Sequence, residues 1–100
     1  MARRLRDGLM ALYTLIIDYE GGTYVMQAHA DSAEVAPSAC IEKWDISDIK
    51  HIFTEEYKAS ILTQLETEYL TALVNMKNVW YGNISLNDNS LTFNLILTDK

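Results

Sequence analysis

The sequence predicts a small α+β protein in which a four-stranded antiparallel sheet carries helices packed on one face. Two stretches of alternating polarity surround Gly21-Gly22, and a second pair surrounds the polar residues 87–90. Between these two pairs lies a segment of helical character with one apolar side. Two hairpins with one apolar face each need a common cover, which the helices can supply. The expected order is therefore β-β-α-α-β-β, with the order of the strands within the sheet left open.

The first hairpin is expected to turn at Gly21-Gly22, because glycine reaches the positive φ angles that a two-residue turn requires. Folding the chain about these glycines makes every second cross-strand pair apolar. Those pairs are Tyr19/Tyr24, Ile17/Met26, Leu15/Ala28 and Tyr13/Ala30. A slip of one residue would turn the apolar set towards water, so the assignment of faces is strongly specified.

Two helices are expected between the hairpins. Proline favours the first turn of a helix, which predicts a helix over residues 37–44, and a short turn follows at residues 47–52. A second helix is expected to begin after Thr54, whose hydroxyl can cap it, and to end between Glu68 and Leu73. Its buried face repeats at four-residue spacing, with the members Tyr57, Ile61, Leu65 and Tyr69.

The second hairpin is expected to turn over the four residues 87–90, which tolerate turn conformations. Its apolar face pairs Leu86/Leu91, Ile84/Phe93, Gly82/Leu95 and Trp80/Leu97. Its other face pairs Ser85/Thr92, Asn83/Asn94, Tyr81/Ile96 and Val79/Thr98. A glycine inside a strand predicts a bulge or the close approach of a neighbouring element at Gly82.

Length and composition predict one domain. Residues 10–100 form the expected α+β domain, and residues 1–9 are expected to be a basic, flexible N-terminal extension. No apolar run approaches the roughly 18 residues of a membrane span, so no membrane partner is expected. A single cysteine gives no reason to expect an oxidising compartment, which predicts a cytoplasmic protein. Cys40 is interpreted as a small buried apolar side chain on the first helix.

The charge distribution argues against nucleic-acid binding. The formal net charge is −6, and from Met10 onward five lysines stand against thirteen acidic residues with no arginine. Binding to phosphate backbones depends on a basic surface that releases counterions. The sequence therefore predicts no nucleic-acid partner, and an acidic surface that can steer a basic protein partner.

The sequence also lacks the patterns of common catalytic sites. No glycine-rich phosphate loop, metal-ligand spacing or nucleophile elbow is present, so no catalytic residue, cofactor or metal is expected. The polar face of the second hairpin gives a candidate partner-binding patch, consisting of Tyr81, Asn83, Asn94 and Ile96. The leading hypothesis is a non-enzymatic protein–protein interaction module that forms a homodimer through a sheet edge or a sheet face. The alternative is a small-ligand binder or enzyme whose pocket gathers distant residues, for instance His29, His51, Trp44 or Tyr81.

Two resemblances accompany these patterns. Residues 13–24, with Gln27, Ala30, Ser32 and Trp44, and the segments 78–80 and 97–99, resemble a group of small uncharacterised bacterial proteins, which implies no activity. The first hairpin and the following helix are also similar to the N-terminal half of HicB-like antitoxins, which bind a small toxin. This second resemblance implies an antitoxin- or immunity-like protein. The second hairpin replaces the DNA-binding tail that such proteins often carry, so only protein binding is implied.

Overall fold

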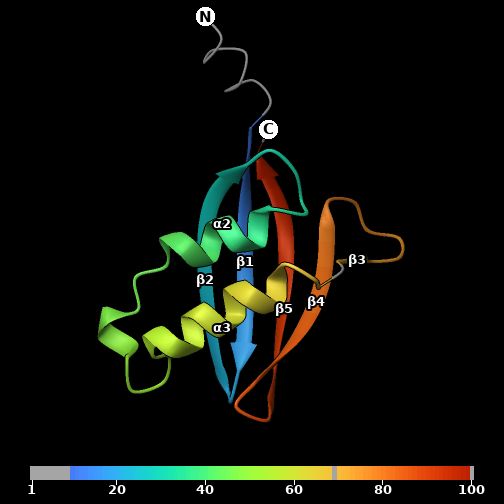
Figure 1. Cartoon of the computed structure of the whole chain (residues 1–100). Coiled ribbons are helices and arrows are strands. Elements are labelled where there is room, and N and C mark those ends of the chain that lie inside the picture. Colours follow the sequence, from blue (N-terminus) through green and yellow to red (C-terminus); the bar gives the residue numbers. More distant parts are fainter. Residues whose placement is uncertain (1–9, 69, 100) are drawn as a thin grey trace, which may run out of the picture.

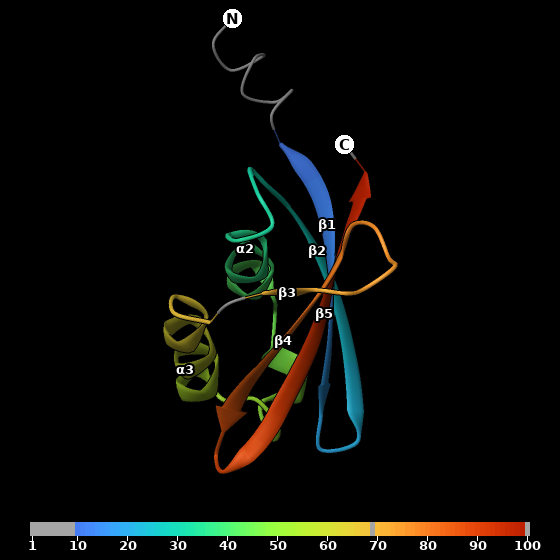
Figure 2. The same ribbon diagram turned by 90° about the vertical axis from the view of Figure 1, so that its right-hand side faces the viewer.

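Five antiparallel strands form the sheet of this protein, in the order β2-β1-β5-β4-β3 (Figure 1). The structure is a computed structural model that describes residues 10–68 and 70–99. Its elements are β1 Ala11–Tyr19, β2 Gly22–Ala30, α2 Ala36–Lys43, the 3₁₀ helix η1 Ser47–Ile49, α3 Glu55–Leu65, β3 Thr71–Ala72, β4 Val79–Leu86 and β5 Asn89–Asp99. The helices α2 and α3 lie on the same side of the sheet (Figure 2). The expected basic extension at residues 1–9 lies outside the described residues, as does Tyr69.

The expectation of four strands in the order β-β-α-α-β-β is wrong, because a fifth strand follows the second helix. β3 pairs with β4 through Thr71↔Tyr81 and Ala72↔Trp80. This strand is possible because α3 ends at Leu65, earlier than expected. Beyond that residue the chain turns, with the backbone and hydroxyl groups of Thr67 both donating to the carbonyl oxygen of Gln64. Thr71 and Ala72, which were expected near the end of the helix, therefore lie beside β4.

Both predicted hairpin registers are wrong by two residues. The first hairpin turns at Glu20 and Gly21, with φ angles of 48° and 84°, and Tyr19 pairs with Gly22. The second turns at Asn87 and Asp88, with φ angles of 53° and 66°. Two successive positive φ angles are those of the two-residue turns that match the twist of antiparallel strands. The sequence therefore uses the same kind of tight turn twice.

In the observed registers, two glycines lie close to aromatic rings. A Cβ atom at Gly22 would lie 2.6 Å from Tyr24 Oη, so this glycine leaves room for the tyrosine ring. Gly82 pairs with Phe93 instead of the expected Leu95, and a Cβ atom at Gly82 would overlap the Phe93 ring. The close approach predicted at Gly82 is thereby confirmed, with the Phe93 ring as the approaching group.

A slide of two residues does not change which face a side chain occupies, because side chains alternate along a strand. The side chains of β1, β4 and β5 that were expected to be apolar and buried therefore line the core. Those buried on the sheet are Tyr13, Leu15, Ile17, Tyr19, Ile84, Leu86, Leu91, Phe93 and Leu95. The hairpins are joined by pairing of β1 with β5, which places one strand of each hairpin at the centre of the sheet.

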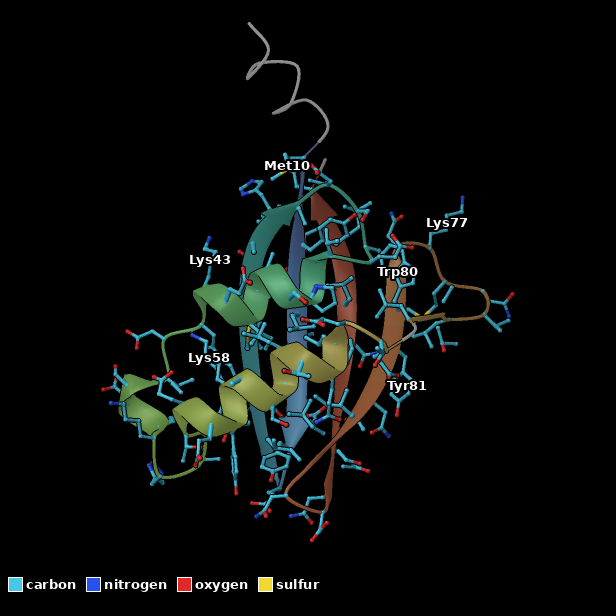
Figure 3. All side chains as sticks on the ribbon, viewed as in Figure 1. Met10, Lys43, Lys58, Lys77, Trp80 and Tyr81 are labelled. Atoms are coloured by element: carbon cyan, nitrogen blue, oxygen red, sulfur yellow. The ribbon has the colours of Figure 1, made fainter. Side chains whose placement is uncertain are left out.

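The helices begin as the sequence predicts. Pro37 lies in the first turn of α2, and the Thr54 hydroxyl accepts a hydrogen bond of 3.0 Å from the backbone N–H of Tyr57 at the start of α3. Lys58 reaches from α3 to the end of α2 (Figure 3), where Nζ donates to the carbonyl oxygen of Trp44 at 2.8 Å. A cation at a helix C-terminus interacts favourably with the helix dipole, so this bond stabilises α2 and holds the two helices together.

Phe53 is the centre of an aromatic cluster under the helices. Its ring is fully buried and lies 4.8 Å from Trp44, 5.1 Å from Tyr24 and 5.3 Å from Tyr19, measured between ring centroids. Inclined aromatic pairs at such separations are favourable beyond the area that they bury. The cluster joins the β1–β2 hairpin to the segment between α2 and α3.

Candidate protein-binding surface

The face of the sheet opposite the helices is not covered by any described element, and we call it the open face (Figure 2). Its side chains alternate with the buried ones along each strand. The residues at these positions are Leu12, Thr14, Ile16 and Asp18 on β1; Thr23, Val25, Gln27 and His29 on β2; Val79, Tyr81, Asn83 and Ser85 on β4; and Thr92, Asn94, Ile96 and Thr98 on β5. The four candidate partner-binding residues, Tyr81, Asn83, Asn94 and Ile96, all belong to this face.

Pairing between the strands brings the candidate residues side by side. Tyr81 lies opposite Asn94, and Asn94 lies opposite Ile16 on the next strand. Val25 pairs with Ile16 on the other side, so one row crosses four strands of the sheet. The expected opposition of Tyr81 with Ile96 is wrong, because Val79 takes that position. The row joins the two hairpins, so it extends the expected patch from the second hairpin onto the first.

A second row lies next to the first and contains Gln27, Thr14, Ile96 and Val79. Together the two rows place five apolar or aromatic side chains near one another, namely Ile16, Val25, Val79, Tyr81 and Ile96. Among them, Val25 is 62 % exposed and Tyr81 is 36 % exposed. Isolated exposed apolar residues are common on protein surfaces, whereas large contiguous apolar patches are typical of interaction sites.

Several polar side chains of the open face hydrogen-bond to each other in the plane of the sheet. Gln27 Nε2 donates to Thr14 Oγ1 at 2.9 Å, and the hydroxyls of Thr14 and Thr98 are hydrogen-bonded to one another. Thr23 Oγ1 donates to the Asp18 carboxylate at 2.7 Å. Groups that already have partners cost less to remove from water. These bonds therefore lower the cost of covering this part of the face.

Charge is distributed unevenly between the two faces of the protein. Asp18 is the one acidic residue among the open-face positions given above, which contain no lysine or arginine. The opposite face carries exposed acidic residues on or beside the helices, namely Glu34, Glu42, Asp45, Asp48, Glu55, Glu56 and Glu66. The centres of protein interfaces are depleted in charged residues and enriched in aromatic ones. The open face has this composition and the helical face does not.

The residues proposed for an enzyme or ligand pocket are not gathered into one site. His29 lines a depression of about 350 Å³ between the end of β2 and α2, while His51 is exposed after η1. Trp44 packs in the aromatic cluster, and Tyr81 lies on the open face. Within residues 10–68 and 70–99, no group of three or more histidine, cysteine, aspartate or glutamate side chains is placed to hold a metal ion.

Cys40 is fully buried, as expected for an apolar role. Burial raises the pKa of its thiol from 9.0 to about 11, although nearby Lys43 acts weakly in the opposite direction. A thiolate is the reactive form of cysteine, and a thiol with this pKa stays protonated at neutral pH. Its environment therefore agrees with packing and gives no support to a nucleophilic role.

Two residues that shape the surroundings of the site were not singled out in the sequence. Phe53 stands directly before the N-cap Thr54, but the partner position of a hydrophobic staple is Lys58, so this local pattern does not identify the phenylalanine. Gln64 reaches from α3 to β4, where its Oε1 atom accepts a hydrogen bond of 3.1 Å from the backbone N–H of Ser85. No local sequence pattern predicts the contact between Gln64 and Ser85, because it depends on how the helix crosses the sheet.

Comparison with known proteins gives no assignment. No protein-family model, curated protein or solved structure matches this sequence. The resemblances noted in the sequence therefore remain predictions. Neither α2 nor α3, the helices of the described residues, has the length and hydropathy needed to cross a membrane.

Proposed function

We propose that this protein is a non-enzymatic, cytoplasmic protein–protein interaction module that binds through the open face of its sheet. The observation that carries the proposal is the charge difference between the two faces. A chain with a formal net charge of −6 keeps a face of sixteen alternating strand positions with a single acidic residue, Asp18. On that face, apolar side chains lie beside amides and hydroxyls that can pair with another protein.

The first occupant to consider for this face is a second copy of the chain. Two copies that approached through their helices would bring several carboxylates together, which costs free energy at low ionic strength. Contact between open faces avoids this repulsion. The contact is expected to be two-fold symmetric, as most homodimer interfaces are, with Tyr81 and Ile96 near the centre.

Sedimentation velocity at micromolar concentration tests the proposal. The wild-type protein is expected to sediment as a dimer of the 11.4 kDa chain. Ile96→Asp and Tyr81→Asp would each bury an unpaired carboxylate in the contact, and each is expected to weaken the dimer by about tenfold or more. Glu66→Lys, on the exposed side of the helical layer, is the matched control and is expected to leave the dimer intact.

A monomer at all concentrations would refute self-association through this face. A dimer that responds to Glu66→Lys and ignores both aspartate variants would place the contact on the helices and would also refute the proposal. Circular dichroism of each variant shows that the fold is retained, so that a change in sedimentation reports binding.

A further inference from the structure

The two edges of the sheet differ in how far their backbone hydrogen-bonding groups are covered. At β4, the backbone N–H of Leu73 donates to the carbonyl oxygen of Val79 at 3.2 Å, and Thr71 pairs with Tyr81. Further along, the side-chain amide of Gln64 pairs with both backbone groups of Ser85. β4 is thus covered first by a short strand and then by a glutamine side chain.

The other edge of the sheet is β2, and its outward backbone groups follow from the hairpin register. A two-residue turn closes on a hydrogen-bonded pair, here Tyr19 with Gly22, and such pairs then recur at every second residue. Tyr24, Met26 and Ala28 therefore bond to β1. The alternate residues direct their N–H and C=O groups outward; they are Thr23, Val25, Gln27 and His29.

Nothing in the described part of the chain covers this edge with hydrogen bonds. Across residues 10–68 and 70–99, no strand lies beyond β2, and no hydrogen bond reaches the outward backbone N–H and C=O groups of those four residues. β2 has nine residues, or about 30 Å of edge. Its sequence contains no lysine, proline or acidic residue, which are the groups that usually protect an edge from pairing. Val25, in the middle of the strand, is 62 % exposed.

A depression at the end of this edge adds a site for a side chain. It has a volume of about 350 Å³, and its lining includes His29 and Asp31 at the end of β2 with Ser38 and Glu42 of α2. The two carboxylates favour a basic group, and none of the lining residues is a lysine or arginine. α2 crosses β2 and projects beyond its outer side (Figure 1), so the helix flanks the edge on one face of the sheet.

We propose that the outer edge of β2 binds an extended segment of a partner protein as an added antiparallel strand, with a basic side chain near the segment's N-terminus seated beside Asp31 and Glu42. Main-chain bonds supply affinity in this kind of recognition, and the pocket at the end supplies specificity. The inference rests on the proposed function in that the ligand is another protein. It uses a different surface, since the added strand would extend the row that starts at Val25 without covering Tyr81.

Amide hydrogen exchange followed by NMR on the full chain tests this proposal, with the synthetic peptide acetyl-Lys-Thr-Val-Thr-Val-Thr-amide as the probe. In the free protein, the amides of Thr23, Val25, Gln27 and His29 are expected to exchange faster than those of Tyr24, Met26 and Ala28. With free peptide at about ten times its Kd, exchange at the outward amides is expected to slow about tenfold. Outward amides already protected in the free chain, or unchanged at peptide excess, would overturn the proposal.

Two modified peptides give a control that does not depend on refolding a variant. N-methylation of the valines and N-methylation of the threonines remove opposite sets of N–H groups. Only the peptide whose methyl groups point away from β2 is expected to bind, and equal binding of both would contradict strand addition. Replacing the peptide lysine with glutamate is expected to weaken binding. An unchanged affinity would show that Asp31 and Glu42 do not contact this side chain of the peptide.

Protein variants then locate the contact. Val25→Pro removes an outward N–H and keeps the bonds of its neighbours to β1, so it is expected to abolish peptide binding. Val74→Ala, at an exposed position that belongs to neither proposed surface, is the control and is expected to bind normally. Tyr81→Asp separates this inference from the proposed function. If it abolishes the dimer and leaves peptide binding intact, both surfaces are supported; loss of peptide binding as well would overturn a separate edge site.

Discussion

Replacing Phe53 with alanine is expected to be among the most destabilising single changes in this protein. The ring is 0 % exposed and has three aromatic neighbours with centroids within 5.3 Å. Truncating a buried phenylalanine costs about 3–5 kcal/mol, since apolar contacts are lost and a cavity remains. The three aromatic pairs place Phe53→Ala near the upper end, at about 4–5 kcal/mol. For a domain of this size the melting temperature would fall by roughly 20 °C.

Urea unfolding at pH 7 measures this effect, with tryptophan fluorescence as the signal because Trp44 packs directly on Phe53. Phe53→Leu keeps most of the side-chain volume and is expected to lower the free energy of unfolding by about 1–1.5 kcal/mol. Val74→Ala, at a position 83 % exposed, is the control and should stay within about 0.5 kcal/mol of the wild type. If Phe53→Ala lowers the free energy of unfolding no more than this control does, the ring does not join the hairpin to the helical layer.

Two further predictions concern the core. Gly82→Ala would push a methyl group into the Phe93 ring and is expected to cost about 1–3 kcal/mol in urea unfolding; wild-type stability would show that the ring does not rest on the glycine. For Cys40, the folded pKa of about 11 exceeds the reference value of 9.0, so the unfolded chain releases the thiol proton first. The free energy of unfolding is expected to fall between pH 9 and 11 by an increment that Cys40→Ala lacks; identical profiles of the two proteins would contradict the raised pKa.

Alternation of polarity predicts the faces of these strands but not their register. Sliding β2 by two residues along β1 keeps every apolar side chain on the core side, so the pattern cannot separate the two arrangements. The choice depends on space near the turn. Glu20 and Gly21 take the two positive φ angles of the turn, and Gly22 becomes the first residue of β2, close to the Tyr24 hydroxyl. A glycine pair therefore predicted the hairpin correctly and its turn residues incorrectly.

The fifth strand could not be read from the sequence for a different reason. β3 has only two residues, too few to show any periodicity, and it forms because α3 stops at Leu65. The apolar residues beyond Leu65 continue the helical spacing, which suggested a longer helix. In the structure, Thr71 and Ala72 pair with β4 instead of continuing the helix.

The members of the candidate surface were predictable because alternation is reliable within a strand. Tyr81, Asn83, Asn94 and Ile96 share a face in the structure, as their spacing required. Placing Ile16 and Val25 beside them requires the order of the strands, which the sequence left open. Pairing of β1 with β5 joins the two hairpins and turns two separate patterns into one surface. The outer edge of β2 could be recognised only after that order was known.

The place of β5 in the sheet affects when the protein can fold during synthesis. β5 leaves the ribosome after the other four strands of this sheet, yet it lies between β1 and β4. Before it emerges, β1 has only β2 as a neighbour, and an isolated hairpin is marginally stable at best. Pairs such as Tyr19 with Leu91 join residues far apart in the chain, and contacts of this kind form slowly. A nascent chain that has not yet reached residue 89 therefore lacks the strand that joins β1 to β4, and it exposes the apolar side chains that this strand would cover.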